Sequence, residues 1–219
     1  MTKLPREIRD MIYFHLSTRH DEHVEREHYR TTRDPLTKLF SYNYERWKAE
    51  HFPEHYWTKE NVAEHFYQEL VESYYRTSTF VFTDDPAIMK RFLTTDEMKL
   101  GLLPKDLVSN VEIKLHAVAR NRGSWRAYMQ FEPNTSEQMR GGLDGMFDLR
   151  EGANVVVRLV TEAKTEEERI ERCEKATAMM FDGEQVERMK AYKVKLVLDD
   201  GREWDFGDKM REQQRMTCR

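Results

Sequence analysis

The first clear pattern in the chain is an apolar stripe close to its start. In LPREIRDMIYFHL, residues 4–16, apolar side chains recur three and four positions apart, which is the spacing of one helix face. Pro5 stands in the first turn, where its missing N–H costs no hydrogen bond. Glu7 follows it, where a carboxylate suits the helix dipole. The pattern predicts an amphipathic helix, which the simplest interpretation packs onto its own domain.

A change of composition follows this helix. Residues 17–35 are almost wholly polar, so they bury too little apolar surface to offset the entropy of ordering them. We therefore expect a flexible charged segment there. Aromatic residues return in residues 36–57, where they either pack beneath the first helix or line a contact surface; they are Phe40, Tyr42, Tyr44, Trp47, Phe52, Tyr56 and Trp57.

Two further helices are predicted before residue 108. One begins after Thr58 as its N-cap and repeats large apolar side chains at i+4, namely Val62, Phe66, Leu70 and Tyr74. The stretch STFVFTDDP, residues 78–86, comes next and begins with a short strand. Asp85 then caps a third helix that starts with Pro86.

Beyond residue 108 the period changes to two. Residues 111–117, 125–131, 154–160 and 192–198 alternate apolar and polar side chains, which is typical of half-buried strands, usually antiparallel ones. The DDG turn at 199–201 predicts a hairpin. A surface helix over residues 166–181 interrupts the strands, with Ile170, Cys173, Met180 and Phe181 facing inward. Helices first and strands later predict an α+β fold, with N-terminal helices packed on a mainly antiparallel β-sheet.

Composition narrows the classes of function. The 219 residues carry 36 basic and 40 acidic side chains, well mixed, for a net charge of −4. Nucleic-acid binding usually needs a concentrated basic surface, which the chain as a whole does not supply. A local basic patch around Trp125, formed by Arg120, Arg122 and Arg126, is better explained as a strand end and its solvated turn.

Cysteine content and hydropathy indicate the compartment. Cys173 and Cys218 are the only two cysteines, which suits a reducing environment better than a disulfide framework. No apolar run approaches the roughly 18 residues that a membrane span needs. We expect an intracellular protein of the cytoplasm or nucleus, with no membrane partner.

One string resembles a metal site by its letters. HFPEH, residues 51–55, has the H-x-x-E-H spacing that places two histidines on a zinc ion in some metallopeptidases. That chemistry needs a continuous helix through His51 and His55, and Pro53 between them would break it. A solvated loop explains the string better, and zinc hydrolysis is kept as the less favoured alternative.

Other candidate sites are no stronger. His20, His23 and His28 lie in the segment expected to be flexible, whereas a metal site needs a rigid scaffold. RGGLDG, residues 140–145, lacks the Lys-Ser/Thr pair of a P-loop, so a flexible loop explains its glycines. Neither cysteine has an activating neighbour in sequence. We assign no catalytic residue, no cofactor and no metal ligand.

The N-terminal stripe does resemble a known motif. Leu4 and Pro5, then Ile8, Ile12 and Leu16, resemble the LPxEIxxxIxxxL start of an F-box. LPREIRDMIY resembles, more narrowly, a group of F-box-like fungal proteins of uncharacterised function. EHFYQELVESYYRTSTFVF (64–82) and LLPKDLVSNVEIKL (102–115) are also similar to segments of that family, so the resemblance covers about half of the chain.

The resemblance implies a non-catalytic protein-interaction module that binds a Skp1-like adaptor of a ubiquitin ligase. The contact residues that it implies are Leu4, Pro5, Ile8, Ile12 and Leu16. The charged segment after the first helix departs from the compact second helix of an F-box. The order of the elements, with no linker that would divide them, predicts a single α+β domain over residues 1–219. Its parts are an F-box-like helix (1–16), a flexible charged segment (17–35), a helical part (58–108), an antiparallel sheet with an inserted helix (109–206) and a tail (207–219).

Two other functions stay open. The chain could be a structural subunit of a larger complex, which would leave an exposed aromatic patch among Tyr42, Trp47, Tyr56 and Trp57. The other is the metal-dependent hydrolase built on His51 and His55. The three hypotheses predict different features. The adaptor needs an exposed apolar stripe on the first helix, the subunit needs an exposed aromatic patch, and the hydrolase needs a pocket lined by polar side chains.

Overall fold

The computed structural model describes residues 4–24, 62–83, 86–119, 132–133, 136–181 and 183–204. In these ranges a six-stranded sheet has the order β1-β2-β3-β6-β7-β8. Its strands are β1 (Glu22–Val24), β2 (Thr79–Thr83), β3 (Asn110–His116), β6 (Asn154–Val160), β7 (Lys193–Leu198) and β8 (Glu203–Trp204). A separate two-stranded antiparallel sheet joins β4 (Val118–Ala119) to β5 (Glu132–Pro133).

The predicted α+β fold with a mainly antiparallel sheet is wrong. Within the six-stranded sheet, the β1–β2, β2–β3, β3–β6 and β6–β7 pairs are parallel, and of the described pairs there only β7–β8 is antiparallel. Parallel neighbours need a crossover between them, and helices that follow each strand supply it. The arrangement is therefore of the α/β type.

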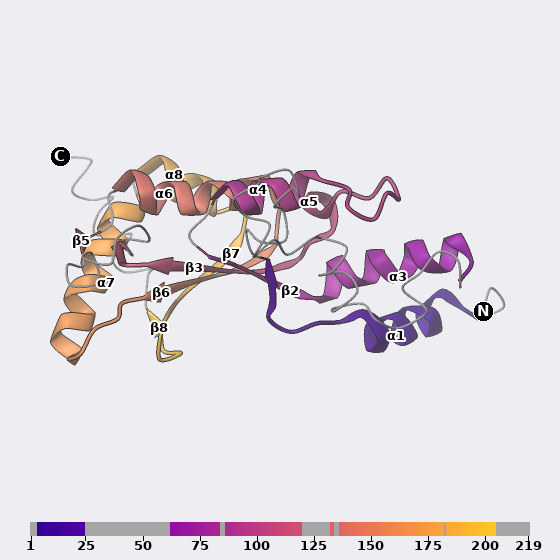
Figure 1. Cartoon of the computed structure of the whole chain (residues 1–219), viewed down its shortest axis with the longest axis horizontal. Coiled ribbons are helices and arrows are strands. Elements are labelled where there is room, and N and C mark those ends of the chain that lie inside the picture. Colours follow the sequence, from indigo (N-terminus) through magenta and orange to yellow (C-terminus); the bar gives the residue numbers. More distant parts are fainter. Residues whose placement is uncertain are drawn as a thin grey trace, which may run out of the picture.

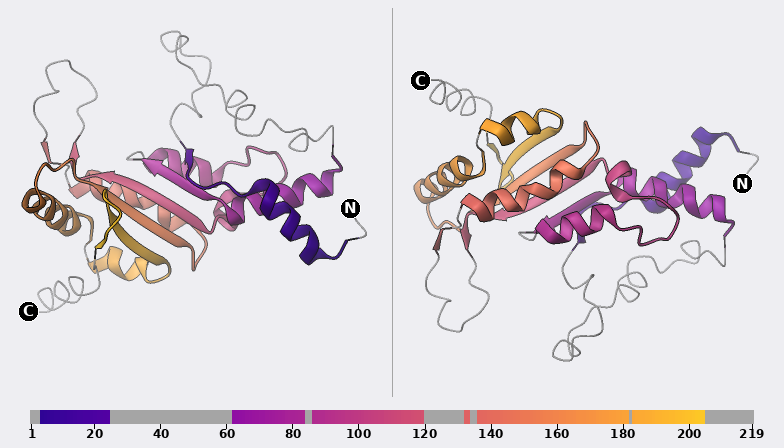
Figure 2. Two further views of the ribbon diagram at one scale, coloured as in Figure 1. Left: turned by 90° about the horizontal axis from the view of Figure 1, so that it is seen from below. Right: turned by 90° about the horizontal axis from the view of Figure 1, so that it is seen from above.

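The helices alternate with the strands along the chain. Their bounds are α1 (Arg6–Ser17), α3 (Glu64–Thr77), α4 (Pro86–Thr94), α5 (Pro104–Leu107), α6 (Ser136–Asp144), the 3₁₀ helix η4 (Gly145–Asp148), α7 (Glu166–Met180) and α8 (Gly183–Met189). Helices α4, α5, α6 and α8 lie along one face of the sheet, and seen from the opposite side the strands are in front (Figures 1 and 2). Helices α1 and α3 lie side by side beyond one end of the sheet.

This one-sided cover explains the alternation in the sequence. Val111, Ile113 and Leu115 of β3 are buried in the hydrophobic core beneath the helices. The intervening Glu112 and Lys114 belong to the other face, where Arg158 of β6 donates two hydrogen bonds to Glu112, at 2.7 and 3.1 Å. An apolar side chain at every second position indicates that one face of a strand is apolar. It does not indicate whether the neighbouring strand is parallel or antiparallel.

Several predicted elements are confirmed. Strand β6 has the predicted bounds, β3 and β7 differ from theirs by one residue at the ends, and β7 turns into β8 as a hairpin. Helix α3 begins at Glu64 with Ala63 as its N-cap, later than predicted. The strand predicted at 125–131 lies outside the described residues, as do Thr58 and Asp85.

The glycine-rich string 140–145 is helical, not a flexible loop. It forms the end of α6 and the start of η4. A Cβ on Gly142 would lie 2.5 Å from Leu115 Cδ2, and one on Gly145 would lie 2.9 Å from Met89 Cγ. These glycines are explained by close packing of α6 and η4 on their neighbours.

Candidate functional site

Helix α1 contacts α3 through one narrow face. Tyr13 is 1% exposed, and its ring meets Phe66 of α3 edge-on at 5.2 Å between centroids. Ser17 Oγ donates to Tyr13 O at 2.7 Å and shares a hydrogen bond with Ser73 Oγ at 3.1 Å. Tyr13 is therefore the main apolar anchor of α1, and polar contacts surround it.

The carboxylate of Glu69 on α3 joins most of these polar contacts. It accepts hydrogen bonds from Arg6 at 2.8 Å, from Arg9 at 3.0 Å through each of two nitrogens, and from the Tyr13 hydroxyl at 2.6 Å. We call Glu69 and these three donors the Glu69 clasp. Charge-assisted hydrogen bonds are stronger than those between neutral groups. Here they hold the side of α1 that carries Arg9 and Tyr13 against α3.

The clasp changes the acidity of its members. Burial disfavours ionisation of Glu69, but the hydrogen bonds from Arg9 and Tyr13 outweigh it and lower the pKa of this carboxyl. Burial and the bond to Glu69 raise the pKa of Tyr13 to about 12. With these pKa shifts, Glu69 is charged and Tyr13 is neutral at neutral pH.

The segment after α1 leads into the sheet. Thr18 and Thr77 share a hydrogen bond of 2.8 Å, and Arg19 N donates to Ser78 Oγ at 2.9 Å. Strand β1 then pairs in parallel with β2, Glu22 opposite Phe80. Residues 22–24, inside the segment expected to be flexible, are thus an edge strand of the main sheet.

Because α1 contacts α3 through the Tyr13 face, part of its apolar stripe points away from the core. Four of the five exposed large hydrophobic side chains in the described ranges belong to α1 or to the residues leading into it: Leu4 (37% exposed), Ile8 (43%), Met11 (61%) and Phe14 (48%). The fifth is Ile170 of α7, which was predicted to face inward and is 39% exposed. Such a concentration is typical of an interaction surface.

The five residues predicted to bind a partner divide into two groups. Leu4, Pro5 and Ile8 are exposed, whereas Ile12 and Leu16 are half-buried and Leu16 packs against the core. Pro5 is the N-cap of α1, and its carbonyl accepts from Arg9 N at 3.2 Å. The exposed face defined here, the α1 stripe, consists of Leu4, Ile8, Met11 and Phe14.

Sequence reasoning left two of these residues out of the site. Met11 was part of the predicted helix stripe but was not assigned to partner binding. Phe14 lies three positions after Met11, so helical spacing already places the two on one face. The signal was in the sequence, and it extends the stripe toward the C-terminal end of α1.

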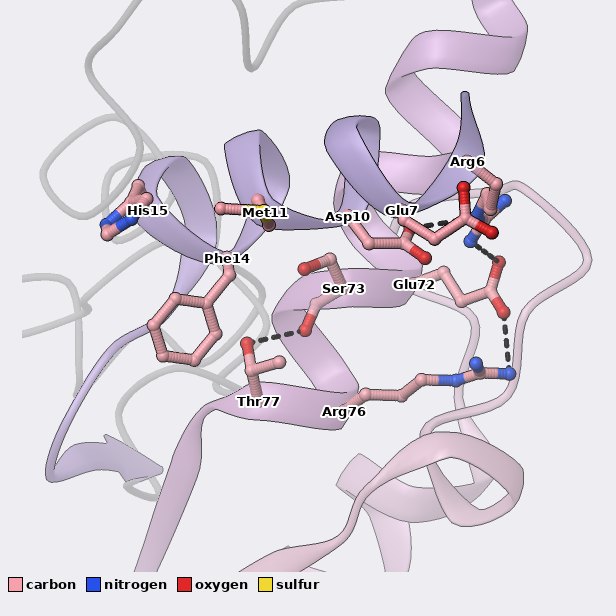
Figure 3. Close-up of a pocket in the computed structure, with 10 residues that line it drawn as sticks. All are labelled: Arg6, Glu7, Asp10, Met11, Phe14, His15, Glu72, Ser73, Arg76 and Thr77. Atoms are coloured by element: carbon pink, nitrogen blue, oxygen red, sulfur yellow. Dashed lines mark hydrogen bonds and ion pairs between the residues drawn. The ribbon is translucent and has the colours of Figure 1, made fainter. Parts of the chain in front are cut away.

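A surface groove runs along α1 beside the stripe. It encloses about 550 Å³ between α1 and α3. Figure 3 shows its ten lining residues: Arg6, Glu7, Asp10, Met11, Phe14 and His15 from α1, and Glu72, Ser73, Arg76 and Thr77 from α3. The charged side chains of Arg6, Glu7, Glu72 and Arg76 lie toward one end, whereas Phe14, His15 and Thr77 lie toward the other. The groove is therefore graded from charged to largely uncharged.

The other candidate sites have mixed outcomes. His51, His55 and the aromatic residues between 36 and 57 lie outside the described residues, as do Cys218 and the arginines around Trp125. Within the described ranges, no group of three or more histidine, cysteine or acidic side chains is arranged to hold a metal ion. Cys173 is buried on α7, and burial raises the pKa of its thiol to about 11. A thiol with that pKa is a poor nucleophile at neutral pH.

Comparison with known proteins gave no match. No protein-family model matches the chain, and searches of curated proteins and of solved structures found none that matches it. Across the described part of the chain, every helix is too short or too polar to cross a membrane. Function must therefore be inferred from the surface of the molecule.

Proposed function

We propose that this chain is a non-catalytic protein-interaction module that binds its partner through the α1 stripe, as an F-box-like adaptor binds a Skp1-like protein. One observation carries the proposal: helix α1 is rotated so that the large apolar side chains of the α1 stripe face outward, while Tyr13 packs inward. Interfaces are enriched in Met and in aromatic residues, which Met11 and Phe14 supply.

Rigidity of α1 also supports this function. The Glu69 clasp holds α1 on α3 without using the α1 stripe. A partner would meet a helix that is already formed and oriented, so less conformational entropy is lost on binding. Burial of the stripe would contribute roughly 25 cal/mol for each Å² of apolar surface removed from water.

An intracellular location fits the same proposal. Cys173 is a free, buried thiol, which is compatible with a reducing compartment. A ubiquitin-ligase adaptor of the F-box type acts in such a compartment, in the cytoplasm or nucleus. Fractionation of cells that express the tagged full chain would test the location, and recovery from the secreted fraction would contradict it.

The test of the function is binding to a purified Skp1 adaptor, measured by isothermal titration calorimetry with the full chain. An Ile8→Asp, Met11→Asp double variant places two charges on the stripe and should abolish binding. Ile170→Asp is the matched control, since Ile170 is similarly exposed on α7, and it should bind as the unchanged chain does. Circular dichroism establishes that all three proteins are folded.

Three results would contradict the proposal. The unchanged chain fails to bind the adaptor, or the double variant binds it as tightly as the control does. Binding that is lost equally in both variants would also contradict it, because a general loss of solubility or folding would then explain the effect.

A further inference from the structure

The groove between α1 and α3 has a direction. Both helices lead into neighbouring parallel strands, β1 and β2, through the paired segments around Thr18 and Ser78. The two helices therefore run the same way, and both begin at the end of the molecule far from the sheet (Figure 1). Their N-termini, each with a partial positive charge, lie at the same end of the groove.

Acidic side chains outnumber basic ones along the groove. Asp10 pairs with Arg6 at 2.7 Å, and Glu72 pairs with Arg76 at 2.6 Å. Glu7 lines the groove as well, and among the residues that the structure describes no cation lies within ion-pair distance of it. Within the described ranges, the charged end of the groove thus has one carboxylate, in the first turn of α1, that forms no ion pair.

The opposite end of the groove suits an apolar group. Met11 and Phe14 supply apolar surface, and the facing α3 wall carries only the short side chains of Ser73 and Thr77 there. Glu7 and Phe14 are seven positions apart on one helix, which corresponds to about 10 Å along its axis. The groove therefore offers an apolar contact and an acidic contact at a defined separation.

We propose that this groove binds an amphipathic helix of a partner protein that runs antiparallel to α1 and α3. An apolar side chain of the partner lies against Met11 and Phe14, and a Lys or Arg about seven residues later in the partner lies against Glu7. The antiparallel direction places the negative end of the partner's dipole near the two positive helix ends. It also places the basic residue in the partner's last turn, where cations are favoured.

This inference rests on the proposed function, since it specifies the chemistry of the partner at the same helix. Its test uses the full chain and three fluorescein-labelled, hydrocarbon-stapled helical peptides of about four turns. The first has Leu followed seven residues later by Lys, the second has the same pair in reversed order, and the third has Glu in place of Lys. Stapling is needed because short isolated helices are only marginally stable in water.

Fluorescence anisotropy should rank the first peptide above the other two, by about three- to five-fold, as expected for one exposed ion pair. Glu7→Gln should remove this advantage by weakening only the first peptide. Glu64→Gln is the matched control, because Glu64 occupies the first turn of α3 and is exposed outside the groove. The control should retain the full ranking.

Three results would overturn the inference: the reversed peptide binds as tightly as the first, Glu7→Gln and Glu64→Gln act alike, or none of the peptides binds. Each is distinguishable from failure of the proposed function. If the Skp1 adaptor binds and the Ile8→Asp, Met11→Asp variant does not, the stripe is a docking surface and only the antiparallel basic helix is refuted.

Discussion

Helices α1 and α6 are both amphipathic, but α6 packs its apolar side chains into the core, whereas the α1 stripe is exposed to solvent. Helix α6 turns Met139 and Leu143 into the core and brings Gly142 against Leu115 of β3. Helix α1 turns Arg9 and Tyr13 toward α3 and leaves its stripe in solvent. The comparison teaches that amphipathic spacing identifies a helix but does not decide which side packs inward.

The largest expected effect comes from a matched pair of truncations. Leu143→Ala should lower the free energy of unfolding by about 2–5 kcal/mol, because it opens a cavity at a fully buried position. Ile8→Ala removes a similar side chain from the exposed stripe and should cost less than about 0.5 kcal/mol beyond helix propensity. Urea denaturation measures both, and equal losses would mean that the stripe is part of the core.

Next in size is removal of the Glu69 clasp. Glu69→Ala leaves the buried Tyr13 hydroxyl and the half-buried Arg9 without their acceptor, which should cost about 1–3 kcal/mol. Limited proteolysis should cut near α1 sooner in this variant than in the unchanged chain. Lys175→Ala, at a solvent-exposed pair on α7, is the control and should change neither quantity.

A smaller effect is expected from acid. The pKa of Glu69 is lowered in the fold, as is the pKa of Glu112, chiefly by its hydrogen bond from Arg158. Their contribution is complete above the ordinary carboxyl pKa of 4.5 and is lost as the pH falls through the lower folded values. Stability measured from pH 7 to pH 3 should therefore decline below about 4.5, and less steeply in Glu69→Gln. An unchanged slope in that variant would contradict the role of the clasp.

The smallest expected effect is at the most exposed member of the stripe. Met11→Gln should leave the free energy of unfolding within about 0.5 kcal/mol of the unchanged chain, because Met11 buries little surface in the free protein. The same variant should weaken adaptor binding measurably by calorimetry. Loss of stability without loss of binding would reverse the assignment of the two helix sides.

Much of the secondary structure could be predicted from local pattern. The apolar positions of β3, β6 and β7 alternate because the described helices α4, α5, α6 and α8 lie along one face of the sheet. Strand direction was not predictable from that alternation, but the helices between successive strands in the chain were a usable signal. Short elements such as β1, with three residues, have too few positions to show any period.

The candidate site was predictable only in part. Spacing alone placed Leu4, Ile8 and Met11 on one helix face. The exposure of that face depends on Glu69, which stands sixty residues after Arg9 in the chain. No local window contains both Glu69 and its three donors, so the sequence predicted the apolar stripe of the helix but not which way it faces.

The short hairpin at the end of the sheet also bears on self-association. Strand β8 covers only Leu196 and Val197 of β7, so among the described residues the first half of β7 has no strand beside it on that side. Lys193 and Lys195 are exposed along this stretch. Lys195 pairs with Glu203 of β8 at 2.6 Å, whereas Lys193 stands beside the part of β7 that β8 does not cover. A lysine at such an edge opposes the addition of a second chain by charge repulsion and so disfavours amyloid-like stacking of one copy on another.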